Sequence, residues 1–182
     1  MMVAVAINSK AQSVKTGYKG FVDAGYSIGS SDYKLNRFEV NTSHGYQFNP
    51  YIFLGAGLGL HFMPSYATED MDIPYEIRDS KVDIPVFANI RFNLSKSKIS
   101  PFLDAKGGTY VTNNGDMYIN ISVGCRFAIN ERQGISIAVG ATSGKLEFER
   151  FDSFIGRYGL NYTRKAAKGL ANAVTLKVGL DF

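Results

Sequence analysis

Ten charged residues stand at positions where their side chains could pair with one another inside the protein. Five are acidic and five are basic. Each lies on the polar side of a segment whose alternate residues are apolar, and random placement would produce this agreement about once in a thousand. Because unpaired charge is costly to bury, equal numbers of opposite charges suit an interior in which they neutralise one another. We therefore predict an internal charge network made of Asp23, Arg37, Glu39, Asp83, Arg91, Asp104, Lys106, Arg126, Lys177 and Asp181.

The sequence contains no motif that would hold a metal ion, a nucleotide or another cofactor. Its two histidines, His44 and His61, form neither an H-E-x-x-H motif nor a cluster with the single cysteine, Cys125. Ser43 and Glu39 lie close to His44 and could suggest a hydrolytic triad, but they occupy the opposite face of the strand. We expect no cofactor and no enzyme activity.

The charged residues are positioned by eight segments of alternating polar and apolar residues. Most segments have the about 9–11 residues of a tilted membrane-spanning strand, or a few more. No apolar run approaches the roughly 18–20 residues of a membrane helix. The pattern predicts an all-β protein, a closed eight-stranded antiparallel up-and-down transmembrane β-barrel. Its strands are expected at residues 19–28, 35–48, 51–62, 82–94, 101–111, 117–129, 134–148 and 172–182.

The final segment, 172–182, has the clearest alternation in the chain. Its even-numbered residues from Val174 to Phe182 are all apolar, and its odd-numbered residues include Lys177 and Asp181. A closed barrel needs its last strand to pair with its first. The segment resembles the C-terminal strand of small Gram-negative outer-membrane barrels, in which a final Phe is the signal read by the insertion machinery. The resemblance implies that Phe182 is an assembly signal and that the insertion machinery is a partner.

The connections between the segments are short at one end and longer at the other. Short turns are expected at 48–51, 94–100 and 130–133, and long loops at 63–81 and 149–171. Both termini then lie on the side of the short turns. This is the layout of outer-membrane barrels, with long loops outside the cell and both termini in the periplasm.

Alternation alone does not say which face of the sheet is inside. A lipocalin-like soluble barrel would have the same period, with its charges outward and an apolar cavity inward. The balanced charges and a polar face rich in Gly, Ser and Asn favour a narrow polar lumen. Aromatic residues of the apolar face also gather near strand ends, as they do at the two interfaces of a membrane. These residues are Tyr46, Phe48, Phe92, Phe127 and Phe182 at the short-turn side, and Tyr26, Phe38 and Phe62 at the loop side.

Pro85 interrupts the predicted strand at 82–94. Proline cannot donate a hydrogen bond to a neighbouring strand, and a closed barrel has no free edge at which to place it. We therefore expect a β-bulge there, which could turn Asp83 away from the face that Arg91 occupies.

The two long loops carry opposite charge. The loop at 63–81 has five acidic residues against two basic ones, and the loop at 149–171 has five basic residues against two acidic ones. In an eight-stranded barrel the two loops would emerge on opposite sides of the mouth. The basic loop could bind lipopolysaccharide phosphates or another acidic surface partner, with an ordinary solvated loop as the alternative. Its basic residues are Arg150, Arg157, Arg164, Lys165 and Lys168, which form no single-faced stripe of the kind that binds nucleic acid.

Residues 1–12 resemble the tail of a secretory signal. They contain a short apolar run and small residues before a possible cleavage point after Ala11 or Gln12, although a basic region is lacking. A first strand or a disordered tail is the alternative. With this segment excluded, residues 13–182 are expected to form one barrel domain.

The eight segments, the asymmetric connections, the signal-like start and the terminal Leu180-Asp181-Phe182 together resemble the small OmpA/OmpX-type outer-membrane barrels. The resemblance covers residues 13–182. Members of that family anchor the envelope, act as adhesins, help resist host defences or serve as accessory subunits of outer-membrane complexes. The resemblance implies contact with outer-membrane lipid and lipopolysaccharide, and a protein partner in that membrane is one option. We expect a plugged polar lumen and a structural or interaction role, with a narrow pore for small solutes and a lipid-modifying enzyme as alternatives.

Overall fold

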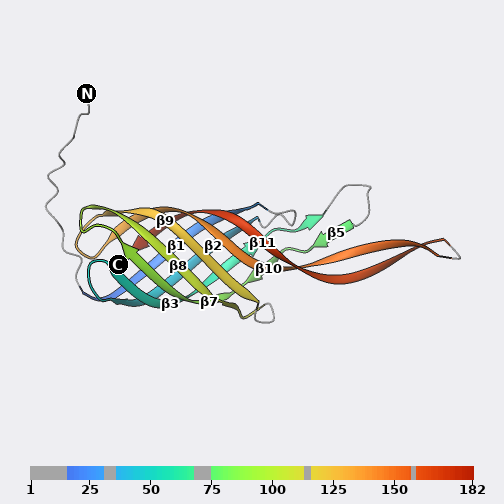
Figure 1. The fold of residues 1–182 in the computed structure, drawn as a ribbon, viewed down its shortest axis with the longest axis horizontal. Coiled ribbons are helices and arrows are strands. Elements are labelled where there is room, and N and C mark those ends of the chain that lie inside the picture. The colour runs from blue at the N-terminus through green and yellow to red at the C-terminus, as the bar shows by residue number, and fades with distance from the viewer. Residues whose placement is uncertain (1–15, 31–35, 68–74, 113–115, 157–158) are drawn as a thin grey trace, which may run out of the picture.

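The chain forms one sheet that curls round until its two edges meet (Figure 1). The computed structural model describes residues 16–30, 36–67, 75–112, 116–156 and 159–182, of which 66–67, 75–78, 145–156 and 159–168 are described by their backbone alone. These residues contain no helix, and so none long and apolar enough to cross a membrane. The strands are β1 (Gly17–Gly29), β2 (Arg37–Gln47), β3 (Ile52–Met63), β4 (Tyr66–Ala67), β5 (Tyr75–Arg78), β6 (Lys81–Asp83), β7 (Pro85–Asn93), β8 (Ile99–Tyr110), β9 (Met117–Ala128), β10 (Gly134–Gly156) and β11 (Gly159–Asp181).

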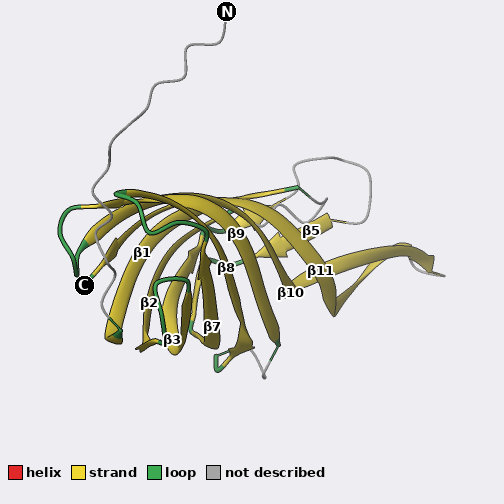
Figure 2. Ribbon diagram, turned by 60° about the vertical axis from the view of Figure 1, so that its left-hand side comes forward, coloured by secondary structure: helices red, strands yellow, loops and turns green. Residues whose placement is uncertain are grey.

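Eight lines of strand close the barrel. Their order around the wall is β11, β1, β2, β3, β7, β8, β9 and β10, and β10 pairs with β11 to complete the ring. The short β6 continues the line of β7 and pairs with β3. Neighbouring strands are antiparallel throughout the ring. The predicted closed, eight-stranded, antiparallel up-and-down barrel is therefore confirmed, and Figure 2 shows its curved wall.

Burial alternates residue by residue along the wall, which is what fixes the register. Between β1 and β11, Val22 lies opposite Leu180 with both side chains outside, and Asp23 lies opposite Gly179 on the inside. A slip of one residue would turn every apolar side chain inward and every charge outward. The polar residues of the predicted pattern thus face the interior and the apolar ones face outward.

The sequence prediction was wrong about the connection at 149–171. That connection is not a loop, because β10 and β11 each run for 23 residues and stay paired from Gly134 opposite Asp181 to Gly156 opposite Gly159. The two strands leave the barrel wall and project beyond it as a twisted ribbon (Figure 1). A ribbon outside a barrel has no interior to bury, so neither face needs to be apolar and the alternation disappears from the sequence.

The other long connection, between β3 and β6, contains the hairpin of β4 and β5. β5 pairs with β10, where Glu76 lies opposite Arg150. Since β3 and β10 stand four places apart in a ring of eight, this hairpin reaches from one wall to the opposite one. The two long connections therefore leave the ring on opposite sides, as predicted, but they then meet where β5 pairs with β10. The reason is backbone pairing, for which the extended β10 supplies a free edge.

Pro85 does not produce the expected bulge. His61 lies opposite Asp83 and Leu58 lies opposite Val86, so two residues separate the pairs on each strand and none is inserted. The ladder is interrupted instead, with β6 ending at Asp83 and β7 beginning at Pro85. Because the register is kept, Asp83 is buried on the same side as Arg91.

Candidate functional site: a charged network inside the barrel

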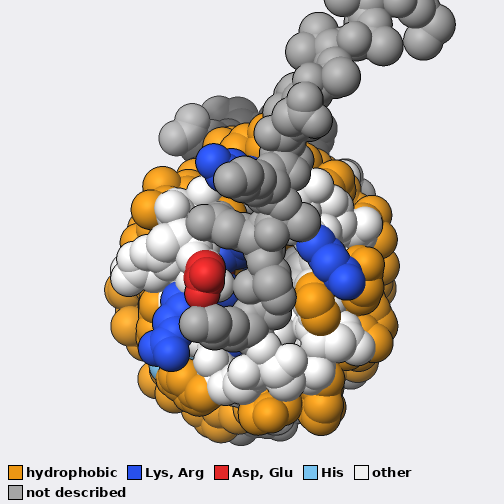
Figure 3. Space-filling model, turned by 90° about the vertical axis from the view of Figure 1, so that its left-hand side faces the viewer, with side chains coloured by type: hydrophobic (Ala, Val, Ile, Leu, Met, Phe, Trp, Pro, Cys, Tyr) orange, Lys and Arg blue, Asp and Glu red, His pale blue; other side chains and the backbone are white. Residues whose placement is uncertain are grey.

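The interior of the barrel is polar and its exterior is apolar. All ten charged residues singled out in the sequence are inside, none of them more than 6% exposed. Large apolar side chains cover the outer wall, among them Leu58, Val123 and Leu176. The aromatic residues expected near the strand ends, from Tyr26 to Phe182, are exposed as well. Figure 3, which looks onto the short-turn end, shows apolar side chains around the outside and charged ones within that ring.

At the short-turn end, one carboxylate holds two cations. Arg126 on β9 donates from Nε to Asp181 at 2.9 and 3.0 Å and from Nη2 at 2.7 Å, a bidentate contact. Lys19 on β1 completes the group, with its amine 2.6 Å from Asp181 Oδ2. Sequence reasoning missed Lys19, although it stands four residues before Asp23 on the same side of β1 and that parity could have revealed it.

Halfway along the barrel, an ion pair connects opposite walls. The Lys106 amine on β8 is paired with Asp23 on β1, and these strands stand four places apart in the ring. Asn41 on β2 donates to the other oxygen of Asp23 at 3.2 Å. The pair is buried at both ends. A side chain stretched across the full width of the lumen divides it into two parts.

Arg91 fills the level of the lumen between the Lys106–Asp23 pair and the short-turn end. Its guanidinium lies between two aromatic rings, with its carbon 4.1 Å from the centre of the Phe21 ring and 4.2 Å from that of Phe102. Its Nε donates to Asp104 at 3.0 Å, and Asn89 donates to the same oxygen at 2.9 Å. Arginine suits this place because its planar cation can stack on rings and still pair with a carboxylate at its edge.

Near the loop end, the network becomes aromatic. Arg37 lies 3.1 Å from Glu39 and donates from Nη1 to the Tyr110 hydroxyl at 2.6 Å. His61 is hydrogen-bonded to the same hydroxyl at 3.2 Å and, through Nε2, to Asn41 at 3.1 Å. The Tyr118 ring packs against those of His61 and Tyr110. Tyr110, Tyr118 and Asn41 were not among the predicted site residues, because neutral side chains on a polar face do not stand out in a sequence.

Two of the predicted charges are not joined to the others by ion pairs. Lys177 donates to the amide oxygen of Asn120 at 2.6 Å, and no carboxylate in the described part of the chain lies within ion-pair distance of it. Asp83 is paired at 3.1 Å with Lys81, which is partly exposed at the mouth. The network therefore consists of four ion-paired groups along the axis, with Lys177 attached through a neutral amide and Asp83 paired at the mouth.

Glycines on the wall make room for these large side chains. A Cβ atom on Gly57 would stand 2.6 Å from the Phe87 ring, and one on Gly124 would stand 2.7 Å from the Phe102 ring. Eight strands enclose an interior only wide enough for side chains to fill. A cavity of about 10 Å³ remains between Arg91, Asp104 and Lys177, which is about the space of one water molecule.

The outer wall holds a second polar group. His44 is exposed and is hydrogen-bonded through Nδ1 to the Tyr18 hydroxyl at 2.6 Å and through Nε2 to Thr42 at 2.9 Å. Ser43 and Glu39 are buried inside the barrel. The three residues of the conceivable triad thus lie on both sides of the wall and do not converge. Among the described residues, no group of His, Cys, Asp and Glu is arranged to hold a metal ion.

The remaining predicted residues have more limited descriptions. Phe182 follows β11, and its backbone exchanges two hydrogen bonds with Gly20 of β1. Of the basic residues expected in a loop, Arg150 belongs to β10 and Arg164, Lys165 and Lys168 belong to β11, while Arg157 lies outside the described residues. The predicted signal remnant at 1–12 also lies outside them.

Comparisons with known proteins find similarity to solved structures. No family model matches the chain, and no curated protein sequence matches it. Among solved structures, the neisserial surface protein A (NspA) is 15% identical, with a TM-score of 0.48 and coverage of 91% of this chain and 96% of that one. A barrel described as a de novo design of transmembrane β-barrels is 14% identical, with a TM-score of 0.44 over 91% of this chain and 95% of that one. The resemblance to OmpA/OmpX-type barrels stays a prediction.

Proposed function

We propose that this chain is an integral β-barrel of a bacterial outer membrane, with a closed polar lumen and an interaction role at the cell surface. The observation that carries the proposal is the polarity of the wall, whose charged side chains face the interior and whose apolar side chains face outward. A water-soluble barrel would expose its charges and bury its apolar side chains. A bilayer stabilises the opposite arrangement. Its hydrocarbon favours apolar side chains on the outside, and a closed barrel forms the hydrogen bonds of its backbone N–H and C=O groups internally.

The filled lumen favours a plug over the alternative of a narrow pore. The Lys106–Asp23 pair, the stacked Arg91 and the Arg37–Tyr110 bond all cross the interior at different levels. Each cation has lost its hydration, so moving one aside would leave a buried carboxylate alone. Passage of a solute would require several of these contacts to break together.

The ribbon of β10 and β11 supplies the interaction surface. β11 pairs with β1 only from Ala173 onward, and no strand in the described part of the chain covers its edge from Gly159 to Asn172. An uncovered edge is a ready template for an added strand. From Ser153 to Leu180 the sequence contains no acidic residue but several basic ones. We infer that the partner is acidic, either an extended protein segment or lipopolysaccharide phosphates.

This function has an orientation. With the short turns in the periplasm, the ribbon and the β4–β5 hairpin stand outside the cell and Phe182 stands at the periplasmic rim. We propose that Phe182 is read by the insertion machinery during assembly. The nearest enzymatic alternative would need a nucleophile, a base and a carboxylate on one side of the wall, and Ser43, His44 and Glu39 do not provide it.

Planar bilayers test the plug and the membrane location together. We expect purified protein to float with liposomes after reconstitution and to give no steady conductance of porin size. A large and reproducible conductance would favour the pore. Failure to float would contradict the membrane location itself.

A further inference from the structure

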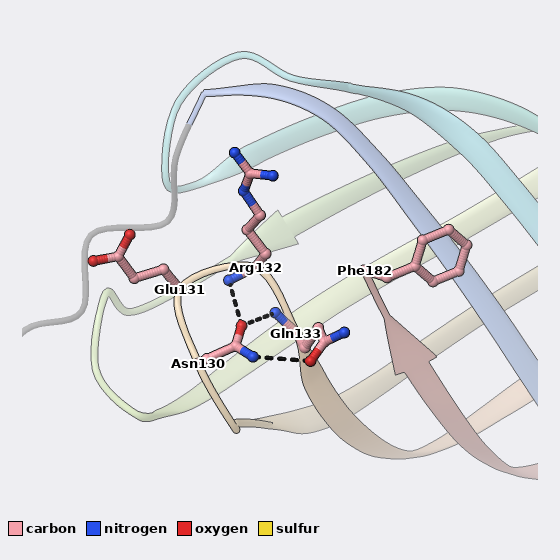
Figure 4. A pocket seen from close by; sticks show the side chains of 5 residues that line it. All are labelled: Asn130, Glu131, Arg132, Gln133 and Phe182. Atoms are coloured by element: carbon pink, nitrogen blue, oxygen red, sulfur yellow. Dashed lines mark hydrogen bonds between the residues drawn. The ribbon is translucent and has the colours of Figure 1, made fainter.

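The described surface has a hollow beside Phe182, at the short-turn rim. Two neighbouring depressions of about 510 and 370 Å³ share Glu131, Arg132 and Phe182 in their walls. One continues along the 130–133 turn (Figure 4), and the other continues along the start of β1 from Thr16 to Lys19. We call the pair the Phe182 groove.

The turn that carries Arg132 is held rigid. Asn130 accepts hydrogen bonds from the backbone N–H groups of Arg132 at 2.9 Å and Gln133 at 2.8 Å, and its amide donates to the Gln133 side chain at 2.8 Å. Lys19 donates to the Arg132 carbonyl at 3.4 Å. The Arg132 guanidinium has no ion-pair partner among the described residues. The backbone is therefore fixed while the cation stays available.

The apolar side of the groove is also fixed, although it is exposed. The Tyr18 side chain is 68% exposed, yet its hydroxyl is tied to His44, which Thr42 holds from the other side. The Phe182 ring packs edge-on against His44, with the ring centres 6.2 Å apart. A Cβ atom on Gly20 would stand 2.6 Å from the Phe182 ring, so the missing side chain leaves the space that the ring occupies. Binding there would order few side chains, which favours affinity.

A cation without an ion-pair partner among the described residues lines the same groove as the Tyr18 and Phe182 rings, and this combination suits an amphiphile with an anionic head. We propose that the Phe182 groove holds a glycerophospholipid of the periplasmic leaflet, with its phosphate on Arg132 and an acyl chain beside Phe182 and Tyr18. Arginine is suited to phosphate because its fork can donate two parallel hydrogen bonds. The proposal rests on the proposed membrane location, since the rim of the barrel must then lie at the level of lipid headgroups.

Lipid retention by the full chain tests the proposal. The purified protein would be exchanged into mild detergent with phosphatidylglycerol or with diacylglycerol of the same chains, and bound lipid counted by native mass spectrometry. We expect one retained phosphatidylglycerol, and about tenfold weaker retention of diacylglycerol and of phosphatidylglycerol by Arg132→Gln. Lys98→Gln, which removes an exposed cation from another short turn, is the matched control and should retain lipid normally.

A second variant tests whether the hydrogen bond that fixes Tyr18 contributes to lipid binding. Tyr18→Phe keeps the ring and removes its bond to His44, so we expect weaker retention with unchanged barrel folding. Equal retention by Arg132→Gln and the parent, or equal binding of diacylglycerol, would overturn the lipid site. Liposome flotation separates this outcome from failure of the proposed function. A protein that floats but shows no Arg132 dependence keeps its membrane role and loses only the lipid site.

Discussion

At the scale of single residues, each charged side chain inside the barrel can be buried because it has a hydrogen-bonding or ion-pair partner. Arg91 combines an ion pair to Asp104 with two ring contacts, and Arg126 binds both oxygens of Asp181. Buried pairs of this kind add little net stability compared with apolar substitutes, but loss of one partner is strongly destabilising. The network therefore specifies the fold more than it strengthens it.

Removing Arg91 should show this asymmetry. Arg91→Met keeps an apolar chain between the rings of Phe21 and Phe102 but leaves Asp104 unpaired, and we expect a loss of about 3–5 kcal/mol in the free energy of unfolding. Adding Asp104→Asn should recover much of that loss. Urea unfolding in detergent or liposomes of the parent, both single variants and the double variant would give the coupling energy. A coupling energy near zero would indicate that water screens the pair.

A charged side chain placed on the outer wall should destabilise the barrel. Val123 lies near the middle of β9, is 54% exposed on the outer wall and stands opposite Leu103 and Val139. In a bilayer, Val123→Arg should cost about 2–4 kcal/mol, whereas Val123→Leu should be nearly neutral. Unfolding of refolded variants in bilayers measures both. Parent-like stability of the arginine variant would mean that the outer wall does not face lipid.

At the scale of elements, the predictable part of the fold is the barrel wall, whose strands have one polar face and one apolar face. Every wall strand was located from its alternation, and ends differ from prediction by a few residues. The ribbon that β10 and β11 form beyond Gly144 was not predicted as a pair of strands. Because the ribbon encloses no interior, its polar and apolar residues do not alternate. The pairing of β5 with β10 was equally hidden, since it depends on backbone hydrogen bonds between segments 70 residues or more apart in sequence.

The free edge of β11 should be visible in amide exchange. Phe182 exchanges both backbone bonds with Gly20, so even-numbered residues of β11 direct their N–H groups toward β1 and, farther along, toward the uncovered edge. We expect Arg164, Ala166 and Lys168 to exchange faster than Lys165 and Ala167, whose N–H groups face β10. Hydrogen–deuterium exchange followed by NMR in micelles measures this, and an acidic strand partner should slow the even set. Uniform exchange along the ribbon would argue against an open edge.

At the scale of the whole molecule, alternation and charge balance were enough to predict a closed barrel and its inside. They could not predict which charges would meet. Lys106 and Asp23 pair across the lumen, and Lys177 meets an amide, because those choices depend on strand stagger and on side-chain length. Asp181 with Lys19 could have been anticipated once β1 and β11 were taken as neighbours.

Phe182 should affect assembly more than stability. Its ring lies on the outer wall against His44 and takes no part in the interior network. We expect Phe182→Ala to lower the amount of protein in the outer membrane of cells severalfold, while the unfolding free energy of refolded protein changes by about 1–2 kcal/mol. Membrane fractionation and urea unfolding provide the two values. Normal membrane levels of the variant would rule out a role for the ring as a signal.

The position of Asp181 has a consequence for the order of events during folding. Its two cations come from β1 and β9, so neither is neutralised until β11 arrives between β10 and β1. In a sheet that lacks β11, Arg126 and Lys19 would stand at the short-turn rim without their carboxylate, and a buried cation left unpaired costs on the order of several kcal/mol. Half-built intermediates are thereby penalised and the complete ring is favoured. We therefore expect the Asp181 group to form only when β11 joins β10 to β1, and to favour the closed ring over a sheet that lacks β11.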